Sequence, residues 1–291
     1  MMDIKKAIIP SAGLGTRFLP LTKAVSKELL PLVEKPLIHY TVQEAKASGI
    51  LKIIFVLSEN KKNILNYFKK DLKLQNLLKE RNQKELLEKL EKFYAEYQDL
   101  AFSSVFQFLP KGDGDAVLKA RRQIGKENFA VLFPDDVWES RTPPTLQLKK
   151  IFLTSQKPVI GLKKIEKEKV SSYGVVMAER IATRIYKIKD IVEKPSIEEA
   201  PSDLVITGRY MFSPDIFNYL TKTPPNKKGE IILAEALKLM IKDGKIVYGY
   251  ELEGEWLECG RPEEWLKTNL YLCLRDPVYG PMLREWLKKM K

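Results

Sequence analysis

Histidine is almost absent from this 291-residue chain, which contains only His39. One histidine excludes a histidine-rich metal site and makes a Ser-His-Asp triad improbable. Cysteine is also scarce, and Cys259 and Cys273 do not have the spacing of a metal site. This usage fits a reducing cytoplasm, which is the expected location. No apolar run reaches the ~18 residues of a membrane span, and no apolar signal segment follows the N-terminus.

The chain is strongly basic, with a formal net charge of +12. Basic domains often bind nucleic acid, but here the lysines are spread along the chain and interleaved with glutamates. No basic arm or aromatic–basic RNA motif occurs, so we expect no nucleic-acid partner. The apolar share of 44% is that of a globular protein, and the length allows one large domain or two modest ones.

A glycine loop follows the first apolar strand pattern. The run Ala7–Ile9 leads directly into Ala12, Gly13, Leu14, Gly15, Thr16 and Arg17. Glycines let the backbone turn tightly and approach a bound group, and consecutive N–H groups in such a loop form a concavity that binds anions. Arg17 and Lys27 add positive charge at the same strand end. The pattern predicts a polyphosphate site; an ordinary strand-to-helix turn with surface charges is the alternative.

Two common phosphate-binding loops do not match this stretch. The dinucleotide fingerprint G-x-G-x-x-G requires a third glycine where this chain has Phe18. The loop G-x-x-x-x-G-K-[ST] has no match nearby. Phe18 therefore disfavours a nicotinamide-dependent dehydrogenase.

The apolar periodicity predicts an α/β fold. Helical patterns cover 36–49, 60–92, 229–240 and 262–291, and buried strand patterns cover 52–57, 105–108 and 129–133. From residue 158 strand patterns follow in quick succession, at 158–162, 173–178, 183–193 and 204–213. We predict a Rossmann-like, doubly wound mixed sheet with helices on both faces, a smaller antiparallel β region and C-terminal helices.

The order of short motifs resembles that of the sugar-1-phosphate nucleotidyltransferases, and among them the bacterial UTP–glucose-1-phosphate uridylyltransferases. Besides the glycine loop, the resemblance is carried by Lys27-Glu28-Leu29-Leu30-Pro31, Lys35-Pro36-Leu37-Ile38, Gln107, Lys111-Gly112, Pro134-Asp135, Tyr173-Gly174-Val175-Val176, Glu193-Lys194-Pro195 and Gly208-Arg209-Tyr210. These motifs cover nearly the whole chain in the family's order and spacing.

The resemblance implies an activity. It is the transfer of uridylyl from UTP to glucose 1-phosphate, giving UDP-glucose and pyrophosphate by Mg²⁺-assisted in-line attack on the α-phosphorus. The implied nucleotide-binding residues are Ala12, Gly13, Leu14, Gly15, Thr16, Gln107, Gly112 and Gly114. Gln107 is the residue whose amide faces uracil, since an amide offers both a donor and an acceptor.

The resemblance also implies the residues of the sugar-phosphate and metal sites. Those for the sugar phosphate are Gly174, Glu193, Lys194, Gly208 and Arg209. The implied metal ligands are Asp135 and Glu258, with Asp136 as second choice for Asp135. Arg17, Lys27 and Lys194 are the implied catalytic residues, because phosphoryl transfer depends on charge neutralisation.

Five positions depart from the family's pattern. Asp113 and Asp115 stand where the uridylyltransferases commonly have leucine and histidine, and carboxylates there repel phosphates unless they face solvent or cap the following helix. Glu258 replaces the usual aspartate, and Ile232 and Ala234 replace glutamine and threonine. These departures leave open the use of dTTP or another sugar, and a non-catalytic regulatory homologue. The intact charged set disfavours a regulator.

The predicted organisation is a catalytic domain over 1–260 and a helical C-terminal segment over 261–291. Within the domain, 1–140 is the nucleotide-binding half, with a helical insertion at about 60–92, and 141–260 is the sugar-phosphate half. The C-terminal segment either packs on the sheet or forms a subunit contact. We expect a homodimer or homotetramer.

Overall fold

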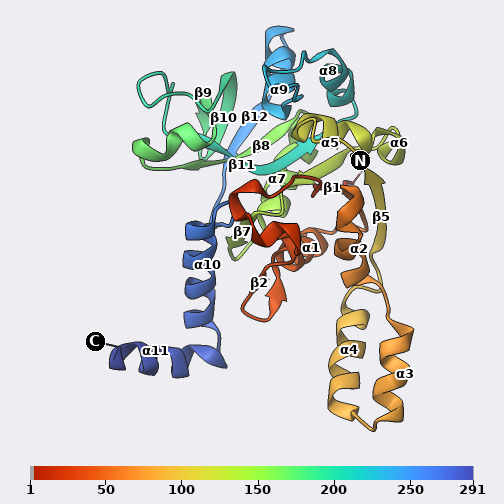
Figure 1. Ribbon diagram of the computed structural model, residues 1–291. Coiled ribbons are helices and arrows are strands. Elements are labelled where there is room, and N and C mark those ends of the chain that lie inside the picture. Colours follow the sequence, from red (N-terminus) through yellow and green to blue (C-terminus); the bar gives the residue numbers. More distant parts are fainter. Residues whose placement is uncertain (1–2, 291) are drawn as a thin grey trace.

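A mixed sheet forms the centre of the protein in the computed structural model, which describes residues 3–290. The sheet has nine strands in the order β5-β4-β1-β6-β11-β8-β12-β10-β9 (Figure 1). Its first half is parallel and contains β1 (Lys6–Pro10), β4 (Lys52–Leu57), β5 (Ala101–Phe106) and β6 (Phe129–Leu132). The carboxyl ends of these strands therefore meet at one edge, where ligands bind in open α/β sheets.

The second half of the sheet is mostly antiparallel. Its strands are β8 (Val159–Lys164), β9 (Gly174–Ala182), β10 (Ile185–Glu193), β11 (Leu204–Phe212) and β12 (Tyr248–Glu251). β11 pairs antiparallel with β6, which joins this half to the first. β12 is the exception because it runs parallel to β8, and β9 also pairs with β11 through Val175 and Val205.

Apolar residues alternate between the two faces of the sheet, and helices cover both faces. In β1, Ile8 packs into one hydrophobic cluster while Ala7 and Ile9 pack into the other. The Ile8 face is covered by α5 (Asp113–Lys119), α6 (Arg121–Ile124), α8 (Ile216–Lys222) and α9 (Leu233–Lys242). The opposite face is covered by α1 (Leu37–Ala47), α2 (Lys62–Phe68) and α7 (Pro144–Ser155). The predicted doubly wound fold is confirmed.

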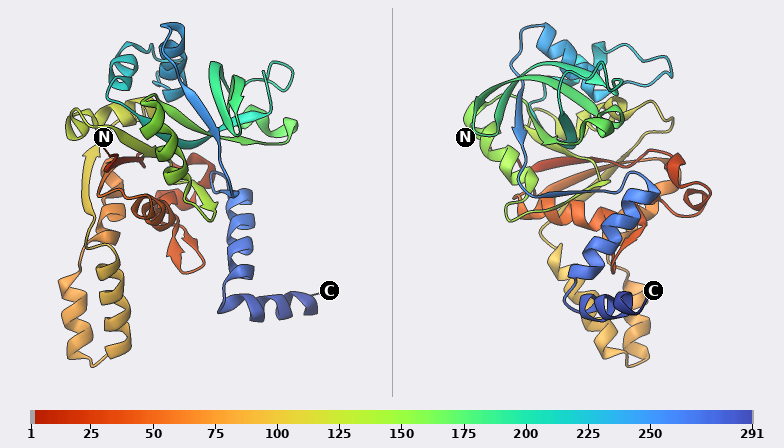
Figure 2. Two further views of the ribbon diagram at one scale, coloured as in Figure 1. Left: turned by 180° about the vertical axis from the view of Figure 1, so that it is seen from behind. Right: turned by 90° about the vertical axis from the view of Figure 1, so that its left-hand side faces the viewer.

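Two helical pairs project from the same side of this body (Figure 2). One is the hairpin of α3 (Leu72–Glu80) and α4 (Lys84–Glu96), and Asp71 caps α3 by accepting a 3.0 Å hydrogen bond from the Leu74 N–H. The other is α10 (Pro262–Arg275) with α11 (Tyr279–Lys289). The C-terminal helices extend away from the sheet, so they do not pack back on it (Figure 1).

Short elements complete the fold. Two small sheets pair β2 (Pro31–Leu32) with β3 (Lys35–Pro36), and β7 (Asp136–Glu139) with β13 (Glu255–Glu258). Five 3₁₀ helices are η1 (Thr16–Phe18), η2 (Leu21–Lys23), η3 (Lys27–Leu29), η4 (Glu59–Lys61) and η5 (Lys167–Ser172). Within residues 3–290, no helix combines the length and apolarity that a membrane span requires.

Several predicted boundaries were wrong, and two of them have a clear physical reason. β5 begins at Ala101, before the predicted 105–108, because the sheet pairs Ser103 and Ser104 with β4 although their polarity hides the strand pattern. α9 begins at Leu233 instead of Gly229. The preceding backbone is used elsewhere: Ile231 donates its N–H to the Lys111 carbonyl at 2.8 Å and accepts from the Gly114 N–H at 2.9 Å.

Candidate active site

The glycine loop leaves β1 in a conformation that requires glycine. Gly15 has φ +65°, and a Cβ there would lie 2.9 Å from Cγ2 of Thr22. The Gly15 carbonyl accepts hydrogen bonds from the Thr22 hydroxyl at 3.0 Å and the Phe18 N–H at 2.9 Å. Gly15 therefore fixes the shape of the loop through its contacts with Thr22 and Phe18. Gly13 has nothing within 4 Å of a Cβ position, so its surface is open to a ligand.

The loop forms one wall of a cavity of about 370 Å³, which we call the nucleotide cleft. Most residues predicted to bind nucleotide line it, namely Ala12, Gly13, Leu14, Thr16, Gln107 and Gly112. Gly114 lies behind this wall, where a Cβ would come within 2.9 Å of the Ile231 carbonyl oxygen. Lys27 and Asp135 also line the cleft.

The two unexpected carboxylates of this region both bind protein groups, although Asp113 also lines the nucleotide cleft. Asp113 accepts hydrogen bonds from the Gly114 N–H at 2.7 Å and from the Leu233 N–H, at the start of α9, at 2.9 Å. Burial raises the pKa of Asp113 to about 6. Asp115 is 5% exposed and accepts a 2.8 Å hydrogen bond from Nε2 of Gln107. Asp113 thus binds first-turn N–H groups of both the following helix α5 and the later helix α9, whereas Asp115 is buried and binds a side chain.

A second cavity of about 220 Å³ adjoins the first, and we call it the sugar cleft. The predicted sugar-phosphate residues that line it are Gly174, Glu193, Lys194 and Gly208. Nζ of Lys194 lies 3.1 Å from Oε1 of Glu193. A Cβ on Gly174 would lie 3.1 Å from the other Glu193 oxygen, so this glycine makes room for the carboxylate.

Asp135, at the end of β6, lines both clefts. Its Oδ2 lies 2.7 Å from Nζ of Lys27. Burial by itself raises the pKa of Asp135, but the charge and hydrogen bond of Lys27, with the Arg17 charge, together hold the pKa below its usual value. Burial likewise lowers the pKa of Lys27, and Asp135 and Glu28 raise it above normal. Both groups are charged where the clefts meet.

Asp135 and Glu258 are carboxylates on the same wall of the sugar cleft. A Cβ on Gly260 would lie 3.3 Å from Oε1 of Glu258 and 3.6 Å from Oδ2 of Asp135, so glycine leaves space between them. Burial raises the pKa of Glu258, and the Tyr173 hydroxyl donates a hydrogen bond to this carboxylate. Asp136 lies beside them, and burial and the Asp135 charge raise its pKa to about 7.

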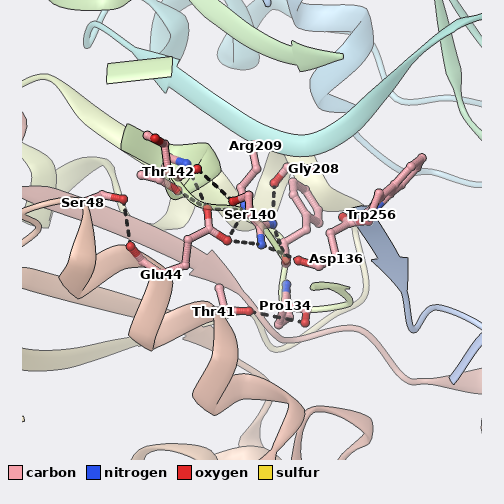
Figure 3. Close-up of polar contacts among 12 residues, drawn as sticks. Thr41, Glu44, Ser48, Pro134, Asp136, Ser140, Thr142, Gly208, Arg209 and Trp256 are labelled. Atoms are coloured by element: carbon pink, nitrogen blue, oxygen red, sulfur yellow. Dashed lines mark hydrogen bonds and ion pairs between the residues drawn. The ribbon is translucent and has the colours of Figure 1, made fainter. Parts of the chain in front are cut away.

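Arg209 does not line either cleft, contrary to the prediction of a sugar-phosphate contact. Its side chain is 1% exposed and points toward α1, where Nη2 lies 2.8 Å from Oε2 of Glu44 (Figure 3). Nη1 donates to the Phe133 carbonyl at 2.8 Å, and Nη2 donates to the Asp136 carbonyl. Arg209 therefore holds the turn that carries Asp135.

Comparison with known proteins shows the family of the chain. A family profile described as nucleotidyl transferase matches residues 6–273. The UTP–glucose-1-phosphate uridylyltransferase 2 of Staphylococcus saprophyticus is 40% identical over 100% of this chain and 99% of its own length. The chain belongs to the nucleotidyl transferase family.

Solved structures of this nucleotidyl transferase family are also similar. The UTP-bound UGPase from Acinetobacter baumannii aligns with a TM-score of 0.90 and 33% identity, covering 99% of this chain and all of the other. A UDP-glucose pyrophosphorylase complexed with UDP-glucose aligns with a TM-score of 0.85 and 36% identity, covering 94% of this chain and all of the other.

Sequence reasoning missed one buried ion pair beside the nucleotidyl transferase site. Nζ of Lys61, in η4, lies 2.7 Å from Oε2 of Glu28, whose side chain is 1% exposed. Glu28 stands next to Lys27 in sequence and lines the nucleotide cleft. Lys61 belongs to a lysine-rich surface segment, so nothing in its sequence distinguished it from its solvent-exposed neighbours.

Proposed function

We propose that this chain transfers the uridylyl group of UTP to glucose 1-phosphate, giving UDP-glucose and pyrophosphate. One observation carries the proposal. A cleft bounded by the glycine loop and Gln107 adjoins a cleft bounded by Glu193 and Lys194, and Asp135 is common to both. A nucleotide in the first and a sugar phosphate in the second bring the two reacting phosphates together beside that carboxylate.

The reaction needs a nucleophile but no strong base. A phosphate monoester has a second pKa of about 6, so an oxygen of glucose 1-phosphate is already ionised at neutral pH. That oxygen attacks the α-phosphorus of UTP, and the bond from this phosphorus to the bridging oxygen of the β-phosphate breaks. Pyrophosphate leaves with that electron pair. The scarcity of histidine in the chain agrees with this route.

Three cations divide the negative charge in this proposal. Lys194 holds the attacking phosphate, since its side chain is 54% exposed beside Glu193 in the sugar cleft. Lys27 neutralises the α-phosphate from the floor of the nucleotide cleft. The N–H groups of residues 13–16 hold the departing pyrophosphate. Arg17, which lines the adjoining sugar cleft and donates a 3.3 Å hydrogen bond to the Gly260 carbonyl, assists them because the arginine fork suits bidentate contact with phosphate.

We propose Mg²⁺ as the metal ion, held by Asp135 and Glu258. The donor set fits, since Mg²⁺ takes one or two protein carboxylates and completes its coordination with phosphate oxygens and water. Across residues 3–290 no group of three or more His, Cys, Asp and Glu side chains is arranged to hold a metal by itself. When bound, Mg²⁺ neutralises phosphate charge. We expect Asp135→Asn to abolish Mg²⁺-dependent turnover, and a wild-type rate would contradict this assignment.

The alternatives from sequence remain open to test. A dTTP-dependent enzyme, or one using another sugar phosphate, would share both clefts. Asp115 is buried and both of its oxygens are paired with protein groups, which removes one objection to UTP. Asp113 lines both clefts, and its Oδ1 accepts from two backbone N–H groups. A regulatory homologue is disfavoured by the presence of Arg17, Lys27 and Asp135.

The test is pyrophosphate release with Mg²⁺ and glucose 1-phosphate, run in parallel with UTP, dTTP, CTP, ATP and GTP. We expect release with UTP well above the rest. Dominant release with dTTP would reassign the nucleotide. Nucleotide binding without release from any of them would favour another sugar phosphate or the regulatory role.

We further propose a homo-oligomer whose contacts involve the C-terminal helices, acting in a reducing cytoplasm where Cys259 and Cys273, both free thiols, stay reduced. Four apolar residues recur every four positions in α11 and at its two flanking positions, and each is more than half exposed: Val278, Met282, Trp286 and Met290. Such an apolar row is typical of an interface. Trp286→Glu should lower the mass measured by light scattering to that of a monomer; an unchanged mass would contradict the α11 contact.

The halves 1–140 and 141–260 then bind nucleotide and sugar phosphate respectively. This division stays a prediction.

A further inference from the structure

The side-chain amide of Gln107 is held in one orientation. Its Nε2 donates to the Gly112 carbonyl oxygen at 2.9 Å and to Oδ2 of Asp115 at 2.8 Å. An amide can rotate by half a turn and exchange its nitrogen and oxygen. Here both partners are acceptors only, because Asp115 is a carboxylate and Gly112 contributes a carbonyl. The exchanged orientation would set the Gln107 oxygen against two other oxygens.

This arrangement leaves the amide oxygen of Gln107 for a ligand. Both N–H bonds of Nε2 are used by Gly112 and Asp115, so the nitrogen has no donor left. Within residues 3–290, no protein group donates a hydrogen bond to Oε1. Gln107 is 5% exposed and lines the nucleotide cleft. At this position the cleft therefore presents a hydrogen-bond acceptor only, because the amide has no N–H left to donate.

We propose that Asp115 is a positioning residue that sets the base specificity of the nucleotide cleft by fixing Gln107. The proposal rests on the proposed function. A fixed Oε1 accepts from a base with an N–H donor at N3, which uracil and thymine have. Neutral cytosine carries a lone pair at N3, so its N3 and Oε1 would repel each other. The site therefore favours UTP and dTTP over CTP.

Two features of α5 stabilise the Asp115 carboxylate in this position. It lies in the first turn of α5, where the positive end of the helix favours a carboxylate. Nζ of Lys119, one helical turn later, lies 3.5 Å from Oδ1 of Asp115. Oδ1 and Oδ2 therefore have different partners. The carboxylate that departs from the family's usual histidine is thus tied to the residue that faces the base.

The test compares UTP with CTP in wild type and in Asp115→Ala. The readouts are the ratio of the two kcat/KM values in pyrophosphate release and the ratio of the two dissociation constants from calorimetry. We expect the preference for UTP to fall at least about tenfold, the effect of removing one hydrogen bond to a charged group. Asp115→Leu gives the same test at similar volume if the alanine variant does not fold.

Two controls separate orientation from general damage. Asp115→Asn keeps an acceptor for Nε2 of Gln107, so its preference for UTP should stay close to wild type. Asp113→Ala removes a carboxylate from the same loop that does not touch Gln107, so it should lower stability without changing the preference.

Failure of this inference and failure of the proposed function would give different results. Equal losses with UTP and CTP in Asp115→Ala, at an unchanged ratio, would show a merely structural role and overturn the inference. Wild-type protein that binds UTP over CTP without releasing pyrophosphate would refute the proposed function and leave the inference standing.

Discussion

Acidic pH should lower the free energy of unfolding through protonation of the single histidine, His39. His39, on α1, is 2% exposed and lies between Tyr67 of α2 and Tyr97, the residue after α4. Its Nδ1 is 3.0 Å from the Tyr67 hydroxyl, and its Nε2 is 3.0 Å from the Tyr97 hydroxyl. A neutral imidazole offers one donor and one acceptor, which suits two hydroxyls. Burial, assisted by the charge of Lys35, lowers the pKa of His39 to about 4.

The magnitude follows from proton linkage. The folded pKa of His39 is depressed from 6.5 to about 4, so its contribution to stability is present above pH 6.5 and is lost as the pH falls. Between pH 7 and pH 5 the loss in the free energy of unfolding is about 2 kcal/mol, and it reaches about 3 kcal/mol below the folded pKa. That is a large part of a typical total of about 5–15 kcal/mol.

The assay is urea unfolding at pH 7 and pH 5 for wild type and His39→Gln. Glutamine keeps a donor and an acceptor but does not titrate. All other titrating groups are shared, so the difference in unfolding free energy between the two proteins should change by about 2 kcal/mol across this pH range. Parallel pH dependence would refute the reasoning. NMR gives a direct check, since the only histidine signal should titrate near pH 4 and not near 6.5.

Three further predictions concern the clefts. Glu44→Ala leaves the buried guanidinium of Arg209 without its carboxylate and should cost about 3–5 kcal/mol in urea unfolding; a loss below about 1 kcal/mol would show that water replaces the partner. Gly208→Ala should lower the melting temperature and the affinity for glucose 1-phosphate, because Gly208 has φ +60° and the new Cβ would lie 2.1 Å from Oδ2 of Asp136; unchanged values would mean that the Asp136 carboxylate moves aside freely. Lys194→Ala should weaken glucose 1-phosphate binding at least about tenfold in calorimetry while UTP binding changes little, and equal losses would remove the proposed role of Lys194.

The glycine loop and most cleft residues could be predicted because their function depends on backbone geometry that few residues permit. Gly15 requires positive φ, and Gly174 makes room for Glu193. Residues with such requirements stand at fixed spacings in the chain, so they can be recognised as motifs. The same holds for Asp135, since a carboxylate that follows a buried strand must lie at the ligand-binding edge of the sheet.

Side-chain direction could not be predicted in the same way. Arg209 follows Gly208 directly, and only the fold shows that its guanidinium turns to Glu44 on α1, across the strand from the sugar cleft. The sequence predicts that Asp113 and Asp115 repel phosphates, and only the structure shows that each has a hydrogen-bond partner within the protein. Contacts between residues far apart in sequence have no local pattern from which they can be read.

The pairing of β6 with β11 has a mechanical consequence. Arg209 to Phe212 form a backbone ladder with residues 129–132, so one uninterrupted sheet runs beneath both clefts. There is no flexible linker at this junction about which the two halves could swing apart. The distance between the two clefts is therefore set by the main chain. Any closing movement during turnover is left to the loops that rise above the sheet edge.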